Sequence, residues 1–294
     1  MSFIRNFDKA NIDRMKGNLL SEAQSNFSFT SSGRYFRLDK SCNAALYEKL
    51  YADVLNGEVF PAVRINELHF YYKGGCLYKF AGGAFKRDKN YEKYGAGFGE
   101  LPPYERAKRE NEEKFKRCSG GDAERQLLDR LCCHTFNPDK KTNVVVLDIE
   151  VNLGGRAVQK CDLVLLNAQT QEIMFVEGKV FSDGRVNVAV SFTPEVISQV
   201  NTYSGAICNQ CQNILEQYKR HIEILNGLFG SAYLPPEKLI MPAKLLVYGT
   251  PRNLNKNGEY TIAKINGELG AGNVLWVTDG EHPTPDEIWN LLAR

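Results

Sequence analysis

The hydrophobic pattern of the second half of the chain changes several times between helical and strand spacing. Leu127, Leu128 and Leu131 share one helical stripe within residues 120–134, which predicts an amphipathic helix. Short apolar runs predict strands at residues 143–153, 159–168, 172–181, 243–250 and 273–279. Two further helices are expected, at residues 194–226 and 284–294, each with a threonine and a proline near its start. The order helix, three strands, helix, strand predicts an α/β sandwich around a mixed central sheet.

The first hundred residues follow a different pattern. Residues 1–40 are polar and rich in Ser and Asn, and they predict a loosely structured arm or a short helix followed by a loop. Residues 42–57 place apolar side chains at helical spacing, and residues 59–83 alternate around a Lys-Gly-Gly turn, which predicts a hairpin or meander. Residues 87–103 are charged, then glycine-rich, and predict a linker. The expected domains are a small N-terminal α+β module at residues 1–100 and an α/β domain at residues 101–294.

Composition and charge narrow the class of protein. With 43% hydrophobic and 24% charged residues, the chain is typical of a globular protein. The first 117 residues carry 21 basic and 15 acidic side chains, and the rest carry 16 and 20. This asymmetry would suit a basic face for nucleic acid beside an acidic metal site. No apolar run approaches the roughly 18 residues of a membrane helix, and the start lacks a signal-peptide core. We therefore expect a cytoplasmic protein with no membrane partner and reduced cysteines.

Three charged side chains interrupt the apolar hairpin of residues 159–181. Glu177 and Lys179 are two residues apart on a strand, so both project from the same face. Asp162, on the neighbouring antiparallel strand, can approach them if the hairpin bends open. Desolvating ionised groups is costly unless a partner or a metal compensates. Two converging carboxylates are the ligands that Mg²⁺ or Mn²⁺ prefers, and Gly178 leaves its backbone carbonyl accessible as a further ligand.

These residues carry a family resemblance. Asp162 and the Glu-Gly-Lys of residues 177–179 resemble the catalytic signature of the PD-(D/E)XK nuclease superfamily, whose core order is helix, three strands, helix, strand. Glu124 is similar to a first-helix glutamate that many members use as a metal ligand. Gln199 and Tyr203 resemble the Gln-x-x-x-Tyr motif of the RecB-like branch, and their spacing places both on one helix face. Cys161 stands where the family has proline, and the N-terminal module lies outside the resemblance.

The resemblance implies a restriction-endonuclease-like αβββαβ core and a nuclease that hydrolyses DNA phosphodiester bonds with Mg²⁺ or Mn²⁺. The metal ligands that it assigns are Asp162, Glu177, the Gly178 carbonyl and Glu124. Lys179 would position the attacking water, and Gln199 with Tyr203 would bind the substrate. Members of the superfamily commonly act in restriction, repair or anti-phage defence. A homodimer or a larger complex in such a pathway is a further expectation, in which the N-terminal module would recognise substrate or partner.

Other interpretations stay open. If Asp162 and Lys179 formed a structural ion pair, the chain would be a non-catalytic nucleic-acid-binding or scaffold protein that retains the nuclease fold. An RNA-directed nuclease is a second alternative. Glu150 and Asp148 either support the site from the first strand or lie on a solvated strand face.

Two further sets of residues each allow two interpretations. Cys208 and Cys211 form a CxxC, which is similar to part of the iron–sulfur cysteine set of some RecB-like nucleases. The pair would otherwise hold zinc with Cys132, Cys133 or His134, or these thiols are packed as small apolar groups. In the N-terminal module, aromatic and basic residues either bind nucleic acid or form a hairpin with an aromatic core. These residues are Phe70, Tyr71, Tyr72, Tyr78 and Phe80, with Lys73, Lys79, Lys86 and Arg87.

Overall fold

The computed structural model describes residues 3–16, 29–94, 103–118, 123–132, 135–137, 142–153 and 160–293, with the backbone alone at residues 29, 32, 118 and 123–127. The chain forms two compact units. The C-terminal unit consists of Met1–Phe3, Thr142–Lys219 and Leu234–Arg294, and the N-terminal unit of Ile4–Lys141 and Arg220–Tyr233. The boundary expected between residues 100 and 101 thus lies inside the N-terminal unit.

The N-terminal unit contains a six-stranded sheet with the strand order β1-β2-β6-β5-β4-β3. Its strands are β1 (Phe29–Ser32), β2 (Tyr35–Leu38), β3 (Phe60–Arg64), β4 (Glu67–Tyr72), β5 (Gly75–Ala81) and β6 (Ala84–Asp88). Its helices are α1 (Lys9–Lys16), α2 (Asn43–Leu55), α3 (Pro103–Cys118) and α4 (Ala123–Cys132), with the 3-10 helices η1 (Lys40–Cys42) and η2 (Lys89–Tyr94). All strand pairs are antiparallel. The meander predicted over residues 59–83 is confirmed as β3, β4 and β5.

Two predictions for this unit are wrong. Strands β1 and β2 lie within residues 1–40, where we expected an arm or a short helix followed by a loop, and β6 with η2 extends over residues 87–94 of the expected linker. The reason is the burial of Arg87 on β6. Its guanidinium forms an ion pair with Glu110 of α3 at 2.8 Å and donates to the carbonyls of Leu77 and Ala107. A short charged segment therefore belongs to the core, which local polarity does not indicate. Residues 95–102 lie outside the described residues.

The C-terminal unit contains the five-stranded sheet β11-β10-β9-β8-β7. Its strands are β7 (Val144–Asn152), β8 (Lys160–Asn167), β9 (Glu172–Val180), β10 (Lys238–Thr250) and β11 (Val274–Thr278). Strands β7, β8 and β9 are antiparallel neighbours, whereas β10 runs parallel to both β9 and β11. The sheet is therefore mixed, and the molecule is a mixed α/β protein with two sheets. The predicted strands of this half are confirmed to within a few residues, except that β10 begins earlier.

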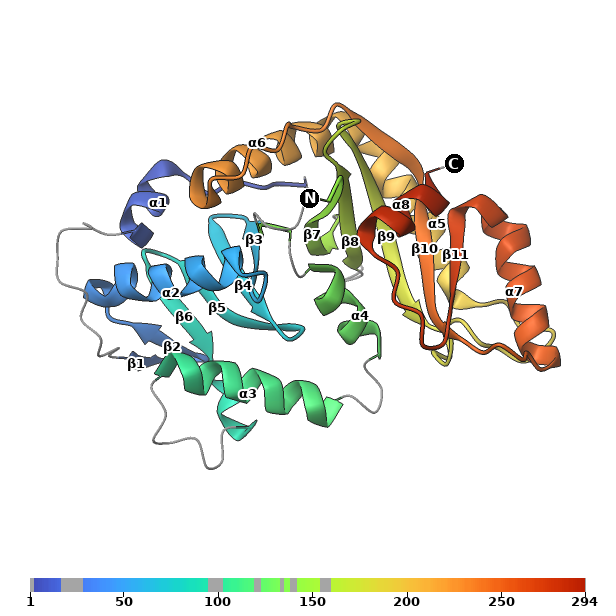
Figure 1. Cartoon of the computed structure of the whole chain (residues 1–294), viewed down its shortest axis with the longest axis horizontal. Coiled ribbons are helices and arrows are strands. Elements are labelled where there is room, and N and C mark those ends of the chain that lie inside the picture. Colours follow the sequence, from blue (N-terminus) through green and yellow to red (C-terminus); the bar gives the residue numbers. More distant parts are fainter. Residues whose placement is uncertain are drawn as a thin grey trace. The chain divides into compact units, whose positions relative to one another are not determined.

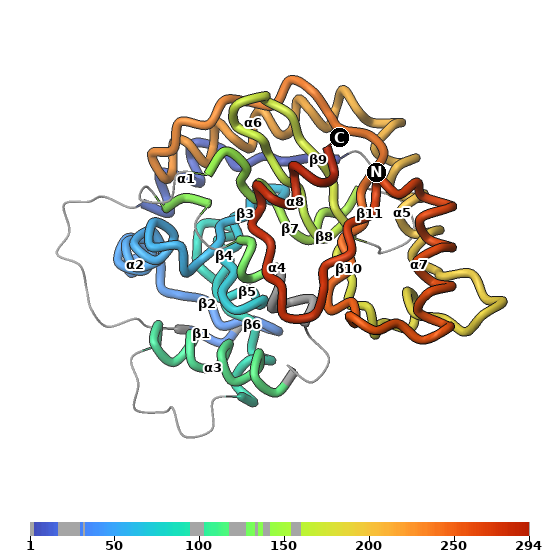
Figure 2. Tube along the Cα trace, turned by 45° about the vertical axis from the view of Figure 1, so that its right-hand side comes forward, coloured from blue at the N-terminus to red at the C-terminus, as the bar shows by residue number. Residues whose placement is uncertain are grey.

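Helices cover both faces of the five-stranded sheet. They are α5 (Glu195–Asn209), α7 (Lys256–Leu269) and α8 (Pro285–Leu292), with the short 3-10 helix η3 (Ala271–Asn273) before β11. Helix α5 packs on β10 and against α7, while α8 packs on β7 and β8. The ribbon and the rotated trace agree that α8 lies on the opposite face from α5 and α7 (Figures 1 and 2). The unit is a three-layer arrangement that buries the central strands on both sides.

The helix expected over residues 194–226 is in fact two helices. Helix α5 ends at Asn209, and α6 (Cys211–Phe229) begins after Gln210, whose backbone leaves the helical region at φ −127°. The Gln210 side chain accepts from the Phe3 N–H and donates to the Leu153 carbonyl. These tertiary hydrogen bonds hold the break, so sequence periodicity alone does not reveal it.

Helix α7 has no counterpart among the sequence predictions. Its large buried apolar residues are only Ile265 and Leu269, so the helical stripe is weak. Its start is nevertheless defined, because the Asn255 side chain accepts from the Gly258 N–H as an N-cap. Within the described part of the chain, none of the helices combines the length and the apolar character needed to cross a membrane.

Candidate functional site

Strands β8 and β9 separate at the position of the charged residues. Their ladder runs from Asn167↔Glu172 to Leu163↔Val176 and ends there. Beyond the ladder, the Gly178 N–H donates to Asp162 Oδ2 at 2.9 Å. The other edge of β9 stays paired with β10 as far as Val180↔Tyr248. The hairpin therefore opens at Asp162, while β9 remains paired with β10 on its other edge.

Lys179 joins the two carboxylates. Its Nζ lies 2.6 Å from Glu177 Oε1 and 3.5 Å from Asp162 Oδ2. It also donates to the Gly178 carbonyl at 2.7 Å. Because Asp162 would be the next residue opposite Glu177 in the antiparallel register, both carboxylates face the same side of the sheet. The structure thus brings Asp162, Glu177, Gly178 and Lys179 together in one cluster.

The cluster is deeply buried except at Asp162, which is partly exposed to solvent. The side chains of Glu177 and Lys179 are 1% and 2% exposed, whereas that of Asp162 is 15% exposed. Glu177 Oε2 is buried and accepts from no donor within the described part of the chain, while the Asp162 carboxyl lies close enough to share a proton with Glu177. A buried acceptor without a donor is costly, so this oxygen is a ready contact for an incoming cation or donor. Solvent reaches the cluster from the Asp162 side.

Burial raises the pKa of both carboxyl groups. For Glu177, burial is the largest cause and the nearby Asp162 charge adds to it, which brings its pKa to about 8 in spite of the Lys179 ammonium. Burial also raises the pKa of Asp162, although Lys179 and the Gly178 N–H partly offset this effect. Two carboxylates with one lysine carry excess negative charge when ionised. A bound divalent cation would relieve this excess.

Helix α5 holds two further predicted residues against the cluster. Gln199 Nε2 donates to Glu177 Oε1 at 2.5 Å and to the Tyr203 hydroxyl at 2.8 Å. The Tyr203 hydroxyl in turn donates to the Lys160 carbonyl at 2.9 Å. Tyr203 is buried, and its pKa is raised first by burial and then by the Glu177 charge. Both side chains therefore contact the protein's own groups in this structure. Their expected contact with substrate stays a prediction.

Cys161 contributes to the site in a way that the sequence did not indicate. Its thiol lies 3.4 Å from the Val176 carbonyl, beside the end of the β8–β9 ladder. The side chain is fully buried, and burial raises its pKa well above the ordinary range. The neutral thiol therefore satisfies a β9 carbonyl where the strands diverge. The only signal in the sequence is its position directly before Asp162.

The remaining predicted metal residues are not placed in the cluster. Glu124 belongs to α4 of the N-terminal unit, and its side chain lies outside the described residues, as do Cys133 and His134. Cys208 is exposed at the end of α5, and Cys211 is half-buried at the start of α6. Among the side chains that the structure describes, no three His, Cys, Asp or Glu residues form a metal-binding group. The expected third carboxylate ligand stays a prediction.

The two acidic residues of β7 take different environments. Asp148 is fully buried, where its carboxylate accepts from the Ile149 N–H and from the Tyr218 hydroxyl. Glu150 is exposed and pairs with Lys160 at 3.2 Å. Asp148 is thus a buried acid whose carboxylate is hydrogen-bonded to β7 and α6, and Glu150 belongs to a solvated strand edge.

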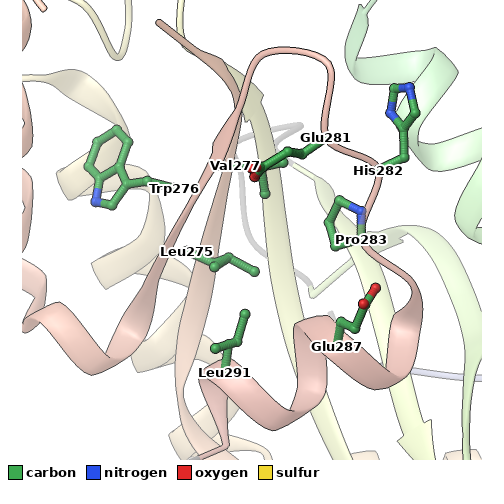
Figure 3. A pocket seen from close by; sticks show the side chains of 8 residues that line it. All are labelled: Leu275, Trp276, Val277, Glu281, His282, Pro283, Glu287 and Leu291. Atoms are coloured by element: carbon green, nitrogen blue, oxygen red, sulfur yellow. The ribbon is translucent and has the colours of Figure 1, made fainter. Parts of the chain in front are cut away.

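A pocket of about 400 Å³ lies elsewhere in the C-terminal unit (Figure 3). It is lined by Leu275, Trp276, Val277, Glu281, His282, Pro283, Glu287 and Leu291. Its two carboxylates already accept backbone N–H groups, Glu281 from Thr278 and Glu287 from Thr284. The Glu287 contact is part of the capping box of α8. Both carboxylates of this pocket therefore form hydrogen bonds with nearby backbone N–H groups.

The cluster at the open end of β8 and β9 has the composition of a hard-cation site. It supplies two carboxylates, one backbone carbonyl, a lysine and a supporting amide from α5. Such groups can bind a divalent cation and stabilise negative charge on a phosphate. Comparisons of the chain with protein-family models, with curated proteins and with solved structures found no match.

Proposed function

We propose that the chain is a metal-dependent nuclease of the PD-(D/E)XK type that hydrolyses phosphodiester bonds in DNA. The observation that carries the proposal is the buried cluster of Asp162, Glu177 and Lys179 at the diverging strands, in which Glu177 Oε2 accepts from no donor among the described residues. The element order β7, β8, β9, α5, α6, β10 supports it as well, because it matches the βββαβ part of the restriction-endonuclease-like αβββαβ core with the helix divided into α5 and α6, while α4, the expected first helix, belongs to the N-terminal unit.

The residues present fit Mg²⁺ or Mn²⁺. Asp162 and Glu177 would hold the ion with the Gly178 carbonyl, and Glu124 stays the proposed fourth ligand. The excess negative charge of the two buried carboxylates favours such an ion. When bound, the ion would activate water and polarise the phosphate.

The chain's own residues would orient and stabilise the reaction. In the hydrolysis, the water oxygen forms a bond to phosphorus, the ester P–O bond breaks, and the leaving oxygen takes up a proton. The Lys179 ammonium, held on Glu177 Oε1 at 2.6 Å, would position the water and offset the charge that develops on the phosphate. Gln199 keeps the Glu177 carboxylate oriented from α5. Tyr203, tied to the Lys160 carbonyl, keeps Gln199 in place.

The test measures cleavage of single- and double-stranded DNA and RNA by the purified protein, in EDTA, Mg²⁺ or Mn²⁺. We expect metal-dependent cleavage that Glu177→Ala and Lys179→Ala each lower by at least about 100-fold. Matched controls are Glu172→Ala, at the other end of β9, and Lys160→Ala, whose side chain is exposed on β8. Both should leave the rate unchanged. Cleavage that survives the substitutions in the cluster would refute the proposed site.

A second function is favoured by one specific observation. Lys179 already binds both carboxylates and the Gly178 carbonyl, so the cluster is largely satisfied without any ion. This would suit a non-catalytic nucleic-acid-binding or scaffold protein that retains the nuclease fold. Titration with Mn²⁺ separates the two functions. Binding that is lost in Glu177→Ala supports the nuclease, whereas no binding by the folded wild type supports the scaffold.

A further inference from the structure

The six-stranded sheet of the N-terminal unit has one face packed as a core and one polar face. Along β4, Leu68, Phe70 and Tyr72 are buried, while Glu67, His69 and Tyr71 alternate with them and are partly exposed. Helix α3 covers the core face, where Tyr104 stacks on Tyr78 with ring centroids 6.2 Å apart. We call the opposite side the outer face, defined by Tyr35, Arg37, Arg64, Glu67, His69, Tyr71, Lys79 and Lys86.

Basic residues form a row across the outer face. Arg37 on β2 lies directly opposite Lys86 on β6, and Lys86 lies opposite Lys79 on β5. Lys79 in turn lies opposite His69 on β4. Residues opposite each other in antiparallel strands share a face, and neighbouring strands are about 4.8 Å apart. Three adjacent strands thus each contribute one cation to a single line, and β4 adds His69, whose pKa is lowered by burial.

The described carboxylates near this row pair with only some of its cations, because Asp88, two residues after Lys86 on the same face of β6, pairs with Arg34. Glu67 is the carboxylate partner of the row and lies 3.1 Å from Lys79 and 2.6 Å from His69. The His69 contact and the Lys79 ammonium lower the pKa of Glu67 to about 2. Among the described residues, neither Arg37 nor Lys86 has a salt-bridge partner. Like charges placed directly opposite in a sheet are destabilising, so an anion on this row would remove an unfavourable interaction.

Tyrosine rings flank the row. Tyr35 precedes Arg37 by two residues on β2, and Tyr71 follows His69 by two residues on β4, so both rings project from the outer face. The Lys79 ammonium lies 4.6 Å from the Tyr35 ring centroid. Both tyrosines are partly exposed. Proteins that bind single-stranded nucleic acid combine basic groups that follow the backbone with aromatic rings on which bases stack.

The aromatic and basic residues of the N-terminal module, for which the sequence allowed two interpretations, lie on different faces of the sheet. Phe70, Tyr72, Tyr78, Phe80 and Arg87 are buried in the core. Tyr71, Lys79 and Lys86 lie on the outer face, joined there by Tyr35 and Arg37, which come from a segment expected to be irregular. The aromatic core and the candidate binding surface therefore coexist on the two faces of one sheet.

We propose that the outer face binds single-stranded nucleic acid, with Arg37 and Lys86 contacting phosphates and Tyr35 and Tyr71 stacking on bases. The choice of nucleic acid over another polyanion rests on the proposed nuclease function. A single strand fits better than a duplex, because its unpaired bases expose the ring faces that the tyrosines would contact. The broad sheet face does not enter the grooves of a duplex as a helix does.

The test measures binding rather than turnover, in a Glu177→Gln background. Fluorescence anisotropy of labelled oligothymidine and oligouridine would be followed at increasing salt. We expect Arg37→Ala/Lys86→Ala to weaken binding at least about 10-fold at low salt. The slope of log K against log salt should fall by about 1.4, which corresponds to two lost phosphate contacts on a single strand. Tyr35→Ala should weaken binding roughly 5- to 100-fold and leave the slope unchanged.

The matched control is Lys49→Ala/Lys116→Ala, which removes two exposed charges from helices α2 and α3 of the same unit. It should bind like the parent. Equal weakening in this control would overturn the proposal, as would unchanged binding by a folded Arg37→Ala/Lys86→Ala variant. Tighter binding of a duplex through the same residues, or equally effective competition by heparin, would also overturn it.

Failure of this inference can be told apart from failure of the proposed function. Cleavage that depends on Glu177, together with oligonucleotide binding that is insensitive to Arg37 and Lys86, would refute the outer-face site alone. Binding that depends on these residues, in a protein that cleaves nothing in any metal, would refute the proposed hydrolysis and support the outer-face site.

Discussion

At the scale of single residues, Glu177 is the most informative group of the candidate site. It is 1% exposed, one of its oxygens binds Lys179 and Gln199, and the other accepts from no donor among the described residues. Burial and the Asp162 charge raise its pKa from an ordinary 4.5 to about 8. The folded protein therefore holds a proton at this position near neutral pH, unless a cation replaces it.

This proton makes stability depend on pH. Below pH 4.5 the carboxyl is protonated in both the folded and the unfolded state. Between pH 4.5 and about 8 only the unfolded state releases the proton. The free energy of unfolding should therefore fall as pH rises through this window, by up to about 1.4 kcal/mol per pH unit, and level off above it. Glu177→Gln removes the ionisation and should flatten this dependence, since its amide can replace the protonated carboxyl.

Urea unfolding of both proteins from pH 5 to pH 8 in EDTA would measure the difference. Glu172→Gln, at the other end of the same strand, is the control and should follow the wild type. Parallel pH profiles for the wild type and Glu177→Gln would show that the Glu177 carboxyl ionises normally in the folded protein.

At the scale of elements, the site depends on the packing of α5 against the open hairpin. Val196, Val200, Tyr203 and Ile207 are buried on one stripe of α5, which anchors the helix on the sheet. This places Gln199 at the cluster, where it donates to both Glu177 and Tyr203. The i, i+4 spacing of Gln199 and Tyr203 was readable in the sequence, and so was their shared helix face. Their hydrogen bonds to Glu177 and to the Lys160 carbonyl come only from the docking of two elements.

A substitution on α5 distinguishes support of the metal site from contact with substrate. Gln199→Ala removes the donor that orients Glu177, so we expect the affinity for Mn²⁺ to fall about 10-fold, as for other groups that hold a metal ligand. At saturating Mn²⁺ the KM for DNA should change little. The control is Thr202→Ala, because Thr202 is exposed on the same helix and its hydroxyl donates to the Ser198 carbonyl. Unchanged Mn²⁺ affinity with a raised KM would instead place Gln199 against the substrate.

At the scale of the whole molecule, the chain builds two sheets with two separate sets of buried polar contacts. The N-terminal unit buries the ion pair of Arg87 and Glu110, in which Arg87 also contacts the Tyr91 ring at 4.9 Å. Both tryptophans of the chain, Trp276 and Trp289, lie in the C-terminal unit. Tryptophan fluorescence therefore reports on one unit, and far-UV circular dichroism on both.

This distribution allows the stability of each unit to be measured. Glu110→Ala leaves the Arg87 guanidinium buried without its counter-ion, which should destabilise the N-terminal unit by about 3–5 kcal/mol. We expect circular dichroism to show an earlier partial transition, while the fluorescence transition stays where it is in the wild type. Glu113→Ala, which removes a surface pair with Lys116 on the same helix, should leave both signals unchanged. A common shift of both signals would mean that the units unfold together.

Much of the C-terminal unit was predictable because its information is local. Apolar runs with strand spacing identified β7, β8 and β9. Strand periodicity alone placed Glu177 and Lys179 on one face, whereas the face of Asp162 depends on the register between β8 and β9.

Predictions from local patterns were wrong where contacts with residues distant in the sequence determine the backbone conformation. The helix breaks at Gln210, whose side chain forms hydrogen bonds with Phe3 and Leu153. Arg87 is buried in the core of the N-terminal unit because it forms an ion pair with Glu110. Helix α7 was missed because its apolar stripe is short.

The amino-acid order alone thus specified which residues carry charge, which segments alternate, and that Asp162, Glu177 and Lys179 belong to one hairpin. Only the tertiary structure decided that the hairpin opens at Asp162, that Lys179 binds both carboxylates, and that Arg37, Lys79 and Lys86 form one row. The physical reason is that strand periodicity depends on neighbouring residues. Register, burial and pKa depend instead on groups brought together from distant parts of the chain, whose desolvation and pairing are determined by packing.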